Sequence, residues 1–167
     1  GEQPPNSPTV RQVGQVVGMK LTHKVELSTW CYAVAQHNGL IYVGGYNSVH
    51  KIDRRGQPSN AISVHGYVHG IDIAGGKMYL LVHYRGWRIA VYNLNYDFIT
   101  SWDHPDVCSY NKLAVNHNSV LISLKNPCSI IRYGTEGQTS RTIRCDHMNN
   151  SDRSILHTAD PDLVIGR

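Results

Sequence analysis

The chain has 167 residues and a formal net charge of +4, and it contains no stretch of about 18 apolar residues, which excludes a membrane-spanning helix. This length is that of one ordinary domain, which can bury a sizeable core without a metal ion or a disulfide. The charge is only mildly basic and lies below that of a dedicated nucleic-acid domain. Ten Tyr and ten His against a single Phe indicate surfaces rich in flat groups that stack and also form hydrogen bonds.

The first nine residues are predicted to be a flexible arm, because prolines stand at positions 4, 5 and 8. The chain begins with Gly rather than Met and no apolar leader follows, which indicates a processed or trimmed chain. Residues 10–167 are then expected to form a single domain.

From residue 31 onward, apolar and polar residues alternate with a period of two between turns, which predicts an almost entirely β protein. The phrase CYAVAQHNGLIYVGGYNSVHKID begins with a strand and has a polar turn at 37–39. A second strand at 40–43, a third at 49–52 and a fourth at 60–64 complete the unit.

The same phrase returns further along the chain. It is repeated as VHGIDIAGGKMYLLVHYRGWRIAVYN with its turn at 75–76, and as SYNKLAVNHNSVLISLKNPCSIIRYG with its turn at 116–118. Fourth strands are expected at 98–102 and 139–145, and RSILHTADPDLVIG begins the phrase a fourth time. Tyr42, Tyr79, Leu121 and Val164 then align with a period of about 40 residues, which is typical of β-propeller blades with four strands each.

The two ends of the chain complement each other. The last phrase supplies a hairpin, at 155–158 and 163–165, and two strands of a blade are missing. Near the N-terminus, 10–13 and Lys24–Leu27 match the third and fourth strands of a blade, so the sequence predicts a ring of about four blades closed by N-terminal strands. Two alternatives are a half-ring completed by dimerisation and an unrelated β-sandwich or barrel.

The phrase NGLIYVGGYNSVHKID resembles the NHL-type repeat, especially that of the C-terminal propellers of invertebrate TRIM-like proteins, and the resemblance covers most of residues 30–165. The positions that fit the pattern G-x-I-Y-V-A-D-x-x-N-x-R-V are Gly39, Ile41, Tyr42, Val43, Asn47 and Val49. The usual Asp after the second strand is replaced by Gly44 or Gly45, and the usual Arg by Ser48. The resemblance implies a binding platform for proteins, or sometimes RNA, and a cytoplasmic location if the chain is TRIM-like.

Catalytic signatures are missing from the sequence. It contains no G-x-S-x-G, no H-E-x-x-H, no P-loop and no dinucleotide fingerprint. His65 and His69 are four residues apart, but in a strand this spacing does not build a metal site on one helical face. One offshoot of the NHL-like family is a metal-dependent lyase, yet no matching set of histidines is found. We therefore expect no enzyme activity, no cofactor and no metal.

Two cysteines fall on the third and fourth strands of one unit. If Glu136-Gly137 forms a two-residue turn, Cys128 faces Cys145 in a non-hydrogen-bonded pair, where a disulfide is possible. The alternative is two buried free thiols. An oxidised pair indicates an extracellular compartment, where Asn149, in the sequon Asn-Asn-Ser, becomes a possible glycosylation site.

The loops between second and third strands are the predicted binding face, because rigid blades hold them. These loops are 44–47, 83–87 and 125–127. The candidate ligand-binding residues are Tyr46, Asn47, His83, Tyr84, Arg85, Trp87 and Lys125. Aromatic side chains and Arg are enriched at interface hot spots. The alternative for Trp87 is that it packs between blades.

Three functions remain open for this face. The first is a non-catalytic module for protein–protein interaction, as a monomer or a homodimer. The second is a carbohydrate-binding propeller in which Tyr or Trp rings stack on a sugar. The third is single-stranded RNA binding, with bases on the same rings and with Arg85, Arg88, Lys51 and Lys125 near phosphates.

Overall fold

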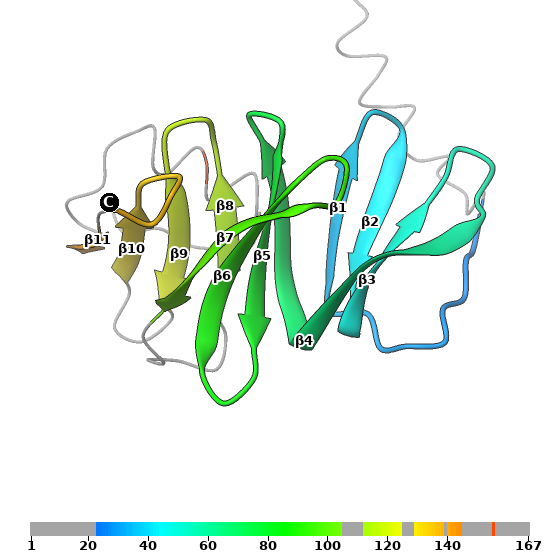
Figure 1. The fold of residues 1–167 in the computed structure, drawn as a ribbon, viewed down its shortest axis with the longest axis horizontal. Coiled ribbons are helices and arrows are strands. Elements are labelled where there is room, and N and C mark those ends of the chain that lie inside the picture. The colour runs from blue at the N-terminus through cyan, green and yellow to red at the C-terminus, as the bar shows by residue number, and fades with distance from the viewer. Residues whose placement is uncertain (1–22, 105–111, 125–128, 139, 145–154, 156–167) are drawn as a thin grey trace, which may run out of the picture.

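The computed structural model describes residues 23–104, 112–124, 129–138, 140–144 and 155. Their strands form two antiparallel sheets, of seven and four strands (Figure 1). The strands are β1 (Ala33–His37), β2 (Leu40–Gly44), β3 (Tyr46–Ile52), β4 (Pro58–Ala74), β5 (Lys77–His83), β6 (Trp87–Asn93), β7 (Phe98–His104), β8 (Lys112–Val115), β9 (Val120–Leu124), β10 (Ser129–Tyr133) and β11 (Ser140–Arg144). Among the described residues, no helix has the length and apolarity that a bilayer crossing needs.

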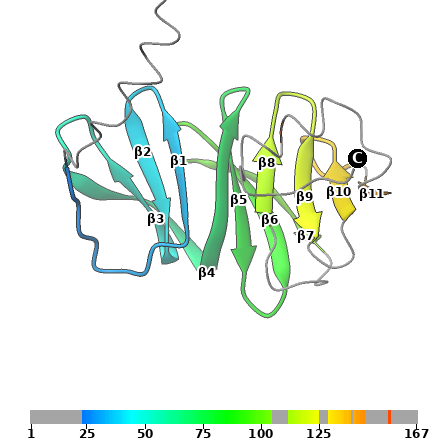
Figure 2. The ribbon, with the colours of Figure 1, turned by 180° about the vertical axis from the view of Figure 1, so that it is seen from behind.

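The strands divide into three four-stranded units, called blades below. The first blade comprises β1, β2, β3 and the first part of β4, and the second comprises the rest of β4 with β5, β6 and β7. The third blade is the separate sheet of β8, β9, β10 and β11, which stands beside the second (Figure 2). The predicted units are therefore confirmed, with one difference: a single 17-residue strand, β4, ends the first blade and begins the second.

The turns explain why the first two strands of the first and second blades pair so tightly. Asn38 and Gly39 have φ angles of 50° and 75°, and they join β1 to β2 in a two-residue hairpin. Gly75 and Gly76 do the same between β4 and β5, with φ angles of 58° and 73°. Positive φ at both turn positions matches the right-handed twist of the flanking strands, so Asn-Gly and Gly-Gly are the residues that this turn prefers.

Two apolar layers hold the blades together. The layer between the first and second blades includes Val49, Ile71 and Leu80. The layer between the second and third includes Leu81, Trp87 and Ile122. The first strands of the blades, β1, β4 and β8, pack against one another in turn. They therefore line a common inner edge.

The described residues include only part of the segments expected to close the ring. Lys24–Leu27 was expected to be a strand, but it forms none, although its side chains alternate between exposed and half-buried. Alternation alone misled this prediction, because a half-buried extended segment shows the same pattern as a paired strand. Ile155 was also expected in a strand; its backbone is helical and its side chain packs against the core of the third blade. Residues 10–13 and the rest of the last hairpin lie outside the described residues.

The register of β10 and β11 agrees with the prediction made from the turn. Ser129 lies opposite Arg144 and Tyr133 lies opposite Ser140, as expected if Glu136-Gly137 forms the turn. The turn itself differs from the prediction: the Gly137 N–H donates to the Gly134 carbonyl over 3.0 Å, so Thr135 and Glu136 are its central residues and Gly137, with a φ of 75°, follows them. Cys128 and Cys145 themselves lie outside the described residues, as does Asn149, so the disulfide and the sequon stay predictions.

Candidate binding site

A row of rings crosses four neighbouring strands at one end of the first two blades. The strand register places Tyr46 opposite Tyr67, Tyr67 opposite His83, and His83 opposite Trp87. Residues directly opposite each other in antiparallel strands point to the same face of the sheet. The rings accordingly touch: the centroids of Tyr46 and Tyr67 are 4.7 Å apart, and those of His83 and Trp87 are 4.6 Å apart and stacked.

Two further rings widen this row toward the inner edge of the blades. His69 follows Tyr67 by two residues, and its ring centroid lies 5.0 Å from that of Trp87. Tyr32, just before β1, lies 5.2 Å from His69 and 5.7 Å from Tyr67. We call this group the aromatic face. It consists of Tyr32, Tyr46, Tyr67, His69, His83 and Trp87.

The members of the aromatic face differ in how much surface they offer. Tyr32, Tyr46 and Tyr67 expose 38%, 47% and 39% of their surface. Trp87 exposes 4% and belongs to the core between the second and third blades, which is the packing alternative considered for it. The tyrosines therefore present the accessible surface, and Trp87 supports the half-buried rings of His69 and His83 from below.

The loop between β5 and β6 forms one side of the face. Arg85 and Gly86 have φ angles of 53° and 135°, and the Tyr84 N–H donates to the Gly86 carbonyl over 2.9 Å. The ring of Tyr84 lies 4.0 Å from that of His65, and the Arg85 guanidinium lies 5.4 Å from the Tyr84 centroid. This geometry gives a cation–π contact at the surface. Tyr84 and Arg85 thus stand together, available to a ligand.

Asn47 has a structural role that the sequence did not indicate. Its φ is 61°, and its Oδ1 accepts a hydrogen bond from the Gly66 N–H over 2.9 Å. This bond ties β3 to the bend of β4, where Gly66 has a φ of 122°. The contact of Asn47 with a ligand stays a prediction. The Oδ1 of this side chain already accepts the hydrogen bond from Gly66.

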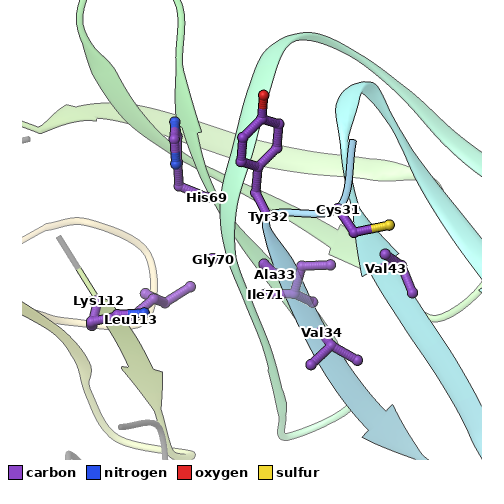
Figure 3. A pocket seen from close by; sticks show the side chains of 10 residues that line it. All are labelled: Cys31, Tyr32, Ala33, Val34, Val43, His69, Gly70, Ile71, Lys112 and Leu113. Atoms are coloured by element: carbon purple, nitrogen blue, oxygen red, sulfur yellow. The ribbon is translucent and has the colours of Figure 1, made fainter. Parts of the chain in front are cut away.

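An open pocket of about 340 Å³ adjoins the aromatic face at the inner edge of the blades (Figure 3). Tyr32 and His69 stand together on one side of it, and Lys112 and Leu113 lie across from Ala33 and Val34. The pocket therefore draws on all three blades, through β1 and β2 of the first, β4 of the second and β8 of the third.

The environment of His69 favours its neutral form. Burial lowers the pKa of His69 below its ordinary value, and the nearby His83 lowers this pKa further. A neutral imidazole carries one N–H donor and one nitrogen acceptor. At neutral pH the ring therefore acts as a hydrogen-bonding group rather than as a fixed charge.

The structure brings together most of the predicted site and adds to it. Tyr46 and His83 come from different blades and meet through Tyr67, which sequence reasoning missed together with Tyr32 and His69. The alternation in GYVHG places Tyr67 and His69 on one face of a strand, and this signal could have identified them.

Two basic residues named for the site are not part of the described face. Lys125 lies outside the described residues. The prediction that Lys51 lies near a ligand on this face is wrong. Lys51 is five residues along β3 from Tyr46, and its Nζ lies 5.6 Å from the ring centroid of Tyr96. Five residues of strand span roughly 17 Å, so Lys51 serves the opposite end of the blade.

Comparisons with known proteins establish the fold. Neither protein-family models nor curated protein sequences match the chain. Among solved structures, the computationally designed Ika4 protein is similar with a TM-score of 0.56 and 13% identity, over 76% of this chain and 79% of Ika4.

Two natural proteins are also similar. BamB from Moraxella catarrhalis has a TM-score of 0.50 and 15% identity over 68% of this chain, and Saccharomyces cerevisiae Sqt1 has a TM-score of 0.51 and 16% identity over 73%. The aligned part spans 36% of the length of each of these two proteins. At such identities the likeness concerns the fold alone: the described blades are part of a β-propeller.

Proposed function

We propose that this chain is a non-catalytic binding module that holds a segment of a partner protein on its aromatic face. The observation that carries the proposal is the row Tyr46, Tyr67, His83 and Trp87, one ring from each of four adjacent strands. β-propellers typically serve as binding scaffolds, which supports this general role.

The dimensions of the row suit an extended peptide. Adjacent strands lie about 4.8 Å apart, so β3, β4 and β5, the three strands that carry the accessible rings of the row, span roughly 10 Å, the length of about three extended residues. Tyrosine supplies a large contact area at low cost in conformational entropy, and its hydroxyl group can still form hydrogen bonds. Arg85 beside Tyr84 adds a permanent cation at the edge, a residue type that is enriched at hot spots.

The NHL-like character of the repeats is part of this proposal. The matching positions have structural roles in the described blades: Gly39 is in a hairpin turn, Tyr42 and Val49 are buried, and Asn47 bonds to Gly66. They support a propeller repeat of this kind, and they carry no information about which partner is bound.

A carbohydrate is the second candidate ligand. The exposed rings of Tyr46 and Tyr67 contact each other at an angle of 37°, and their outer surfaces could stack against one face of a sugar. RNA has less support, because Lys51 lies far from the face. It would need the remaining cations, Arg85 and Arg88, to hold the phosphates.

The test is selection of binders from a phage-displayed random peptide library with the full chain as bait. Selected peptides are synthesised and their affinity is measured by fluorescence anisotropy. We expect Tyr67→Ala to weaken binding at least about tenfold, because it removes the centre of the row. The matched control is Phe98→Ala, an exposed aromatic at the opposite end of the second blade, which should leave the affinity unchanged.

Two outcomes would contradict the proposal. One is equal loss of affinity in both variants. The other is a library that yields no peptide while a glycan array or an oligonucleotide binds in a manner that depends on Tyr67. The steep salt dependence expected of phosphate contacts would identify the RNA case.

A further inference from the structure

The pocket beside the aromatic face has an unusual balance of side chains. Its walls combine apolar side chains, Val34, Ile71 and Leu113 among them, with a comparable share of polar surface, and Lys112 and His69 provide nitrogen donors. Among the described residues that line it, none is Asp or Glu. A pocket of about 340 Å³ that offers both apolar side chains and one cation is suited to an anionic group attached to an apolar stem.

The carboxylate of Asp72 stands next in sequence to this wall, but it is already engaged. Its oxygens accept hydrogen bonds from the N–H groups of Val115, over 2.7 Å, and Ile73, over 2.9 Å. In the part of the chain that the structure describes, Lys112 makes no ion pair. The positive charge at the pocket is therefore not balanced by these side chains.

The pocket and the aromatic face are continuous. Tyr32 and His69 line the pocket, and their ring centroids lie 5.7 Å and 6.2 Å from that of Tyr67 in the row. Figure 3 shows both side chains on the same side of the pocket. A peptide that crosses the row can thus extend one side chain past these two rings toward Lys112.

We propose that this pocket binds an acidic side chain, Asp or Glu, of the peptide held on the aromatic face. The carboxylate pairs with the Lys112 ammonium, the His69 ring donates a hydrogen bond to it, and the methylene stem contacts Ile71 and Leu113. Charge-assisted hydrogen bonds of this kind are about twice as strong as neutral ones. The inference rests on the proposed function, because the peptide must first lie on the aromatic face.

A bound carboxylate also changes the protonation of His69. The rings near this one belong to Tyr32, Tyr67, His83 and Trp87, and the charged side chain that lines the same pocket is Lys112. None of these residues is Asp or Glu. A ligand carboxylate beside the ring favours the imidazolium form. Binding should therefore tighten as pH falls from about 8 to about 6, where the carboxylate is still ionised.

The experiment uses the peptides selected on the full chain. We expect an Asp or Glu to recur at one position. Its replacement by Asn or Gln, and separately Lys112→Met in the protein, should each weaken binding about tenfold. In the double-mutant cycle the two losses should not add, because both remove the same pair. The matched control is Lys77→Met, at the opposite end of the second blade, which should not alter the affinity.

The outcomes separate this inference from the proposed function. Peptides that depend on Tyr67 but carry no recurrent acid, or that bind equally to Lys112→Met and the unchanged chain, would overturn the acidic pocket and leave the aromatic face standing. Loss of affinity that is additive in the cycle would also overturn it. Peptides insensitive to Tyr67 would overturn the proposed function itself.

Discussion

The first two blades share a strand and a repeat phrase, yet they are buried to very different depths. In the second blade, five consecutive residues of β5, from Met78 to Val82, are almost fully buried. In the first blade, β1 alternates between half-buried and exposed residues, and Val34 exposes 68% of its surface. The sequences differ in the same way: β5 is apolar from Met78 to Val82, whereas β1 reads AVAQH and includes Gln36 and His37.

The neighbours of each blade account for the difference. Leu80 faces the layer toward the first blade, while Leu81 faces the layer toward the third, so both faces of β5 are covered. One face of β1 is open in the described structure. A strand between two sheets is expected to be apolar throughout, whereas a strand with one open face alternates. In this fold, the depth to which a strand is buried therefore depends on how many neighbouring blades cover its faces.

The largest expected effect on stability comes from one of a pair of substitutions by alanine that test this comparison. Leu80 is completely buried, so Leu80→Ala should lower the free energy of unfolding by about 2–5 kcal/mol through lost burial and a cavity. Val34→Ala, at the exposed position of β1, should change it by less than about 0.5 kcal/mol. Urea unfolding followed by tryptophan fluorescence measures both. Similar losses in the two variants would mean that β1 is covered in solution.

The junction between the two blades gives the next largest effect. Gly66 has a φ of 122°, and a Cβ there would stand 2.6 Å from the His83 carbonyl oxygen and 2.8 Å from the Tyr84 Cβ. Gly66→Ala should therefore cost about 2–3 kcal/mol, from backbone strain and from overpacking. Gly86→Ala is the control, because its φ is 135° but its Cβ would meet nothing within 4 Å. If the two variants are equally unstable, the close contact at the junction is not important.

Much of this fold could be predicted because it is locally encoded. Asn38-Gly39 and Gly75-Gly76 fix two-residue turns, and a turn of that length also fixes the register of the strands that follow it. The period of about 40 residues then places the blades in order. What the sequence could not show was the continuity of β4 through Gly66, since a glycine in a strand predicts a break as readily as a bend.

The site was predictable only in part, for a physical reason. His83 and Tyr84 are adjacent in sequence, so the sequence itself shows them as part of a dense cluster of functional residue types. Tyr32 and Tyr67 join them through packing between strands that are distant in the chain. The burial of Trp87 likewise depends on the third blade, whose contact with the second cannot be read from the loop itself.

A half-buried carboxylate links the second and third blades and gives the next prediction. Asp72 accepts hydrogen bonds from Val115 in β8 and from Ile73. Asp72→Ala should lower the free energy of unfolding by about 2 kcal/mol, because it leaves the N–H of Val115 without its acceptor. Asp72→Asn should cost less, since an amide oxygen can still accept one of the two bonds.

The pH dependence of the free energy of unfolding tests the protonation of Asp72. Burial raises the pKa of Asp72 above its ordinary value, although the two N–H bonds oppose this shift. The folded state then holds the proton more tightly than the unfolded state. The contribution of the protonated Asp72 carboxyl to stability is therefore complete below the pKa that this group has in the unfolded chain. It is lost as pH rises through the pKa of Asp72 in the folded protein. The stability deficit of Asp72→Asn relative to the unchanged chain should shrink between about pH 4 and about pH 7; a constant deficit would contradict the raised pKa.

The smallest expected effect concerns Asn47, where the same end of the blades serves both structure and binding. Asn47→Ala removes the acceptor of the Gly66 N–H and places Ala at a φ of 61°, so unfolding should become easier by about 1 kcal/mol. Asn47→Asp keeps an acceptor and a residue that tolerates this backbone, and it should recover most of the loss. Peptide affinity should change far less in either variant than in Tyr67→Ala. If Asn47→Asp is fully stable yet fails to bind, Asn47 contacts the ligand directly, and the division between supporting and contacting residues at this face must be redrawn.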